Sequence, residues 1–116
     1  MTKRGDVVVI DFPFTSGGSK VRPAIIVQND RDNARIQKTV VAMVTGNLKR
    51  VAEPTHLLVA PATGEGKSSG LRSASLVVWV NLYTVDQSAV VKTIGHLSDA
   101  LKQKLNDCLK AALELP

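Results

Sequence analysis

Arg22 and Thr45 are two side chains whose types and positions beside apolar runs raise the question of a functional site. Arg22 stands immediately before Pro23 and an apolar run, 24–27, that is typical of a buried strand. The proline biases Arg22 towards an extended backbone, so its guanidinium would be held at the strand entrance. A guanidinium can bind two phosphate oxygens at once and stays charged at any cellular pH. A surface cation whose stem covers apolar atoms is an equally good interpretation.

Thr45 raises a similar choice. It ends the apolar run 39–44 just before Gly46, where a strand would deliver its last side chain into a cleft. A threonine at a strand end is also ordinary in a protein with no site there.

Metal catalysis and cofactor chemistry find little support. The aspartates are scattered over strand starts and loop ends, and neither histidine has a partner at the spacing that metal ligands need. No nucleophile elbow or phosphate-binding glycine loop is present. We therefore expect neither a metal nor a cofactor.

His56 and His96 could form an acid and base pair that cleaves RNA without metal. Nothing in the sequence brings the two together, and a lone histidine near a strand end more often has a structural role. Both a structural role and a catalytic role are therefore kept as interpretations of each histidine.

Short apolar runs rich in β-branched residues recur between polar segments. They predict strands at 6–12, 23–28, 39–44, 56–60, 75–85 and 90–95. Polar loops are expected at 13–20, 46–55 and 61–70, and such loops are where chemistry is usually found.

The last segment changes to a helical period. Apolar residues recur at three- and four-residue steps from Leu101 to Leu113, and Ser98 is placed to cap the helix. The single cysteine, Cys108, falls on the apolar face and is expected to pack there. Six or so strands and one terminal helix predict a mainly β fold, a small barrel or half-barrel.

Length and composition predict one ordinary domain over residues 1–116, with 44% hydrophobic and 22% charged residues. No apolar run approaches the roughly 20 residues of a membrane span, so a cytoplasmic protein without a membrane anchor is expected. The net charge of +5 favours an anionic partner such as nucleic acid. With only four aromatic residues available for stacking, base recognition would depend on polar loops.

Several stretches together resemble the MazF/PemK toxins of toxin–antitoxin modules. They are GDVVVIDFPFTSGGSKVRPAIIVQND, VVAMVTGN, SSGLRSASLVVWVNLYTVD and GHLSDALKQKL, and the likeness runs from Gly5 to about Leu109. Its most specific parts are the opening GD before an apolar strand, the Arg22–Pro23 dipeptide, and the threonine after the next strand.

The resemblance implies an SH3-like barrel with a C-terminal helix, a homodimer, and an endoribonuclease that cuts single-stranded RNA without metal. The 2′-hydroxyl would attack the adjacent phosphorus, leaving a 2′,3′-cyclic phosphate and a 5′-hydroxyl. A MazE-like antitoxin with an acidic tail would occupy the basic groove.

The resemblance also implies site residues. Arg22 matches the family's catalytic arginine and Thr45 its catalytic threonine, while Ser75 aligns with a serine that would brace the site. Candidate RNA contacts are Phe14, Thr15, Lys20, Asn47, Lys49, Ser75 and Asn81, with Arg50 as a further phosphate contact.

The sequence departs from the family at three places. The first loop lacks a glutamate that many members carry, and this leaves the identity of the general base open. Asn81 stands where glutamine is common, and Ala74 stands where aspartate is common. Two alternatives remain: a toxin of the same barrel that binds a protein such as gyrase, like CcdB, and an inactive relative that only binds RNA.

Overall fold

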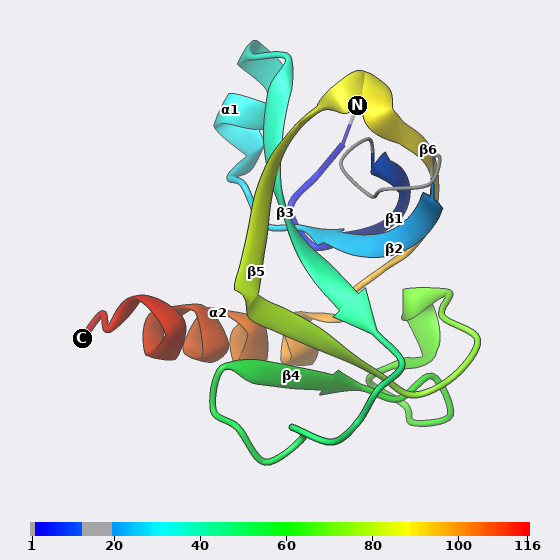
Figure 1. Ribbon diagram of the computed structural model, residues 1–116, viewed down its shortest axis with the longest axis vertical. Coiled ribbons are helices and arrows are strands. Elements are labelled where there is room, and N and C mark those ends of the chain that lie inside the picture. The colour runs from blue at the N-terminus through cyan, green and yellow to red at the C-terminus, as the bar shows by residue number, and fades with distance from the viewer. Residues whose placement is uncertain (1, 13–19) are drawn as a thin grey trace.

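Six antiparallel strands form one curved sheet in the computed structural model, which describes residues 2–12 and 20–116 (Figure 1). They are β1 (Asp6–Phe12), β2 (Lys20–Ile26), β3 (Lys38–Thr45), β4 (His56–Val59), β5 (Ser75–Asp86) and β6 (Val90–His96). Their order across the sheet is β4-β5-β3-β2-β1-β6. The predicted mainly β fold with a terminal helix is confirmed.

The C-terminal helix α2 (Asp99–Leu113) begins where the sequence predicts. The Ser98 hydroxyl accepts a hydrogen bond from the Leu101 N–H at 3.3 Å, as an N-cap residue does. Cys108 is buried on the apolar face with Leu105, so its predicted packing role is confirmed. Burial, and then the charge of Asp107, raise the pKa of the Cys108 thiol.

A short helix that the sequence did not predict, α1 (Asp30–Arg35), follows β2. Asn29 caps it by accepting a hydrogen bond from the Asp32 N–H at 2.8 Å. Asn33 is the single buried residue of this helix, so there is no apolar stripe for a periodicity argument to detect. Two single-turn 3₁₀ helices, η1 (Lys67–Ser69) and η2 (Gln87–Ala89), complete the described elements.

The core lies on both faces of the sheet. Between the sheet and α2 lies a cluster that includes Val7, Ile25, Ala42, Trp79, Leu101, Leu105 and Cys108. On the opposite face lies a smaller cluster of Val8, Ile10, Ala24, Ile26, Val41 and Val85. Figure 1 shows α2 beside β4 and near the bend of β5, in agreement with its contacts to both strands. None of the described helices has the length and apolar character of a membrane-spanning segment.

Strand β2 begins earlier than predicted, at Lys20 instead of residue 23, because it pairs with β1 from Phe12 back to Val7. Arg22 therefore lies within the strand, opposite Ile10, and not at its entrance. The pairing of β2 with β3 is confined to residues 24–26. Pro23 thus lies where β2 pairs with β1 alone, the kind of edge position at which a missing N–H is tolerated.

Strand β5 contains a bulge opposite β3. Ala42 pairs with Leu82 while the next residue, Met43, pairs with Val78, so residues 79–81 have no partner in β3. The Trp79 side chain is buried in the core and Asn81 is exposed. Figure 1 shows that β5 bends sharply along its length, as a bulge predicts.

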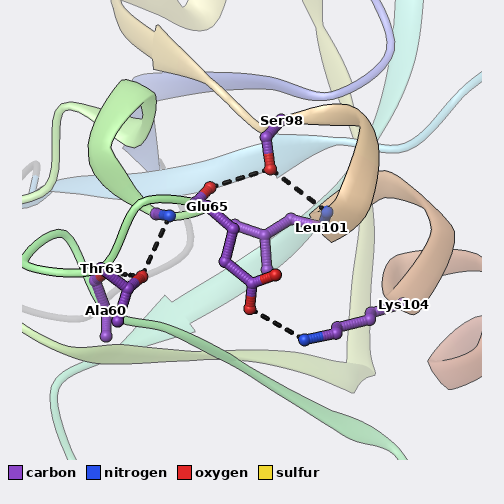
Figure 2. Close-up of polar contacts among 7 residues, drawn as sticks. Ala60, Thr63, Glu65, Ser98, Leu101 and Lys104 are labelled. Carbon is purple, nitrogen blue, oxygen red and sulfur yellow. Dashed lines mark hydrogen bonds and ion pairs between the residues drawn. The ribbon is translucent and has the colours of Figure 1, made fainter.

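The connection between β4 and β5 is fastened to the start of α2 (Figure 2). The Ser98 hydroxyl donates a hydrogen bond to the Glu65 carbonyl oxygen at 2.8 Å, and Lys104 Nζ lies 2.8 Å from Glu65 Oε1. Within the connection, Thr63 Oγ1 donates to the Ala60 carbonyl at 2.6 Å. These bonds fix the loop that joins the two strands.

Candidate functional site

A groove of about 710 Å³ crosses β2, β3, β5 and β4 on one face of the sheet. Its apolar lining consists of Met43, Val44, Leu76 and Val78. Its polar lining comes from β2, the end of β3, the loop 46–55 that follows, the first residue of β4, and the bulge of β5.

Arg22 enters this groove because the first half of β2 has no neighbour on the β3 side. Its side chain is exposed, and no carboxylate within residues 2–12 or 20–116 forms an ion pair with it. The guanidinium charge is therefore available to an anionic ligand.

Thr45 lines the same groove as Arg22. Ala24 pairs with Met43 at the end of the β2–β3 ladder, and Arg22 and Thr45 each lie two residues beyond that pair on their strands. Residues two apart on a strand share a face, so both side chains project to the side of the sheet that carries the groove. The Thr45 hydroxyl is half-buried and accepts a hydrogen bond from the Asn47 N–H at 3.2 Å. The two residues singled out in the sequence thus line one groove.

The loop between β3 and β4 supplies most of the remaining charge. Lys49 and Arg50 line the groove together with one carboxylate, Glu53. The side chain of Asn47 lies in the same lining and its Oδ1 accepts from the Lys49 N–H at 3.0 Å, which shapes the turn. With Arg22 included, three cations face one anion among the described lining residues, a balance that favours phosphate.

Asn81 reaches the groove from the bulge of β5. Ser75 does not line it. Ser75 is buried at the start of β5 and its hydroxyl donates to the Ser73 carbonyl at 3.0 Å, a position suited to bracing the strand instead of contacting a ligand. Phe14 and Thr15 fall outside the described residues, and for Lys20 only the backbone position in β2 is described.

The structure separates the two histidines. His56 begins β4 and lines the groove beside Thr55, whereas His96 ends β6, is exposed, and is absent from the groove lining. The Thr55 hydroxyl lies 2.9 Å from His56 Nδ1. Sequence reasoning raised His56 but could not connect it with Arg22, because the connection depends on strand order.

No described part of the chain brings three or more His, Cys, Asp or Glu side chains together as metal ligands would be. Asp86, a carboxyl with a strongly lowered pKa, stands at the end of β5, paired with Lys38 and outside the groove lining. Hydrogen bonds from the Gln37 side chain and then from Ser88 hold the pKa of Asp86 well below its usual range.

Comparison with known proteins agrees with these features. Residues 3–113 match the family described as PemK-like, MazF-like toxins of type II toxin–antitoxin systems. Endoribonuclease EndoA of Bacillus subtilis is 28% identical over 117 residues, covering 99% of this chain and 97% of that protein. A mycobacterial endoribonuclease in complex with its cognate antitoxin has a similar fold, with a TM-score of 0.81, 23% identity, and coverage of 100% and 98% of the two chains. MazF of Deinococcus radiodurans, in a MazE–MazF crystal structure, superposes with a TM-score of 0.76 at 15% identity over 99% of this chain and 98% of that one.

Proposed function

Because the chain belongs to the PemK-like, MazF-like toxins of type II toxin–antitoxin systems, we propose that it cleaves single-stranded messenger RNA at a short specific sequence. It would do so without a metal ion and be silenced by a cognate antitoxin. The observation that carries the proposal is that Arg22 and Thr45 line one groove whose described charges are mainly positive.

The proposed reaction is attack of a ribose 2′-hydroxyl on the adjacent phosphorus. The O2′–P bond forms, the P–O5′ bond breaks, and the products are a 2′,3′-cyclic phosphate and a 5′-hydroxyl. Negative charge builds on the two non-bridging oxygens in the transition state. Arg22 would bind these oxygens with its planar fork, and Thr45 would donate its hydroxyl hydrogen to one of them.

RNA selection would depend on the loop 46–55 and the bulge of β5. Asn47 and Asn81 offer amide donors and acceptors to base edges, while Lys49 and Arg50 offer charge to the flanking phosphates. Phe14, Thr15 and Lys20 remain proposed contacts from the first loop and the start of β2.

The proposed partners are a second copy of this chain and an acidic antitoxin. The mycobacterial endoribonuclease was solved in complex with its cognate antitoxin, and the Deinococcus protein in a MazE–MazF crystal structure. A disordered acidic segment of an antitoxin would be attracted to the groove that holds Arg22, Lys49 and Arg50. The toxin would act in the cytoplasm, where messenger RNA is translated.

The decisive experiment is digestion of a long single-stranded RNA by the purified protein in EDTA, followed by sequencing of the fragment ends. Cleavage at one short sequence, with 5′-hydroxyl and cyclic phosphate ends, would support the proposal. Intact RNA at protein concentrations that arrest growth would refute it and favour a toxin that binds a protein target. Measurable RNA affinity without cleavage would indicate a binding-only relative.

Arg22→Ala and Thr45→Ala should each lower cleavage by at least about 100-fold, because each removes a preorganised donor to the phosphoryl oxygens. Both side chains lie at the groove surface, so the free energy of unfolding should change by less than about 1 kcal/mol. Arg35→Ala on α1 and Thr93→Ala on β6 are the matched controls, since both residues are exposed outside the groove. Loss of thermal stability together with activity would assign Arg22 or Thr45 to structure instead.

A further inference from the structure

His56 is the one histidine among the described residues that line the groove, and imidazole is the side chain most often used for proton transfer in catalysis. It is half-buried at the first position of β4 and faces Val78 of β5, which in turn faces Met43 of β3. His56, Val78 and Met43 therefore lie side by side across the sheet, on the face from which Arg22 and Thr45 project. The imidazole of His56 lines the groove on the β4 side, and Arg22 lines it on the β2 side.

The strand order places the two cationic or basic walls apart. β4 lies three strand intervals from β2 in the sheet order, which is about 14 Å along the sheet at the usual 4.8 Å spacing. Arg22 from β2, Thr45 from β3 and His56 from β4 all line the groove that spans these strands.

Local structure fixes the ring. Thr55 Oγ1 lies 2.9 Å from His56 Nδ1, and the Thr55 carbonyl accepts a hydrogen bond from the Trp79 N–H in the β5 bulge at 3.3 Å. The His56 N–H donates to the Glu53 carbonyl at 3.1 Å. With Nδ1 engaged by Thr55, Nε2 is the ring nitrogen left to meet a substrate, and no described residue hydrogen-bonds to it.

The proposed reaction lacks a proton acceptor if only Arg22 and Thr45 take part. A guanidinium stays protonated at cellular pH and a hydroxyl is a poor base, so neither would readily accept the 2′-hydroxyl proton. Imidazole is the side chain best matched to that task near neutral pH.

We propose that His56 is the general base of this toxin, an inference that rests on the proposed endoribonuclease function. In the tautomer whose Nδ1–H donates to Thr55 Oγ1, Nε2 takes the proton of the attacking 2′-hydroxyl as the O2′–P bond forms and the P–O5′ bond breaks. The departing O5′ takes a proton from water and the imidazolium returns one to the solvent, so no other reactant is consumed. Arg22 and Thr45 stabilise the phosphoryl oxygens meanwhile.

Glu53 is the competing base in the same groove. It lies in the loop before β4, is exposed, and no hydrogen bond among the described residues holds its carboxylate. Since catalysis requires a base kept in position, the imidazole held by Thr55 is the better candidate.

The test compares His56→Gln, His56→Ala and Glu53→Gln with the wild type on a short RNA that contains the mapped cleavage sequence. His56→Gln should lower kcat by about 100-fold or more while KM changes by less than about threefold. Added imidazole should partly restore His56→Ala but not Arg22→Ala. His96→Gln, at the exposed histidine outside the groove, should keep wild-type kinetics.

Four outcomes would overturn the assignment while leaving the proposed function intact. They are an unchanged kcat in His56→Gln, a rise in KM alone, a folded His56→Ala that imidazole does not restore, and a kcat loss confined to Glu53→Gln. If the melting curve shows that His56→Ala does not fold, the kcat of His56→Gln alone decides whether His56 is the general base. A wild-type protein that cleaves no RNA would remove the proposed function itself.

Discussion

Replacing Ser98 by alanine tests whether the cap of α2 also fastens the β4–β5 connection. The Ser98 hydroxyl accepts from the Leu101 N–H and donates to the Glu65 carbonyl. Loss of an N-cap costs about 1 kcal/mol, and loss of the second hydrogen bond costs about as much again. We therefore expect Ser98→Ala to lower the free energy of unfolding by about 2 kcal/mol.

The corresponding shift in melting temperature follows from chain length. An unfolding entropy of about 2.1 cal/mol/K per residue gives about 240 cal/mol/K for 116 residues, so each 1 kcal/mol shifts Tm by about 4 °C. Ser98→Ala should therefore melt about 8 °C below the wild type. The assay is thermal unfolding followed by circular dichroism, with urea unfolding as a second measure of the free energy.

Two further variants separate the contributions. Ser98→Asp can still accept from the Leu101 N–H but cannot donate to Glu65, so it should lose about half as much, near 4 °C. Lys104→Ala removes the exposed ion pair with Glu65 and should cost less than about 1 kcal/mol. A Ser98→Ala protein that melts within about 2 °C of the wild type, or a Lys104→Ala protein that is equally destabilised, would refute the double role of Ser98.

Two other predictions concern packing and pH. In Gly95→Ala the new methyl group would overlap the backbone carbonyl of Ser68, so we expect a loss of about 3 kcal/mol by urea unfolding, whereas Gly46→Ala, which meets nothing within 4 Å, should be neutral. Equal losses of stability in Gly95→Ala and Gly46→Ala would contradict the proposed steric overlap. The lowered pKa of Asp86 means that its contribution to stability is present above the unfolded value of about 3.9 and is lost as the pH falls through the folded value. Between pH 5 and pH 2 the Tm of Asp86→Asn should therefore fall by less than the Tm of the wild type. Parallel curves of Tm against pH would disprove a stabilising role for the Asp86 carboxylate.

The strands and the terminal helix could be predicted because their patterns are local. Alternating or continuous β-branched runs mark each strand, and the apolar stripe behind Ser98 marks α2. Helix α1 could not be found in this way, since its stability comes from the Asn29 cap and the buried Asn33 side chain, which bonds to Gln28 and Thr39. The start of β2 was misplaced because pairing with β1, not local propensity, extends it through Pro23.

Residue types indicated part of the candidate site, and the strand order assembles the rest. Arg22 and Thr45 were noticed beside apolar runs, the family resemblance gave them their expected roles, and in the structure both line one groove. Asn81 was expected from the same resemblance and His56 was raised from its residue type. Their places in the groove depend on features without a sequence signature: the position of β4 beyond β5, and the bulge of β5. Pairings between distant segments decide such positions, and one sequence does not reveal them.

Because of the three unpaired residues in the β5 bulge, the exact length of this strand decides which side chains face the groove and which face the core. On one side of residues 79–81 the strand aligns Leu76 and Val78 with Thr45 and Met43, and on the other it aligns Leu82 with Ala42. Deleting a single residue there would shift one half of the strand by one position, so that each of its side chains would point to the opposite face of the sheet. Core side chains would become exposed, or groove-lining side chains would leave the groove. Insertions and deletions should therefore be rejected in this stretch even where every remaining amino acid is retained.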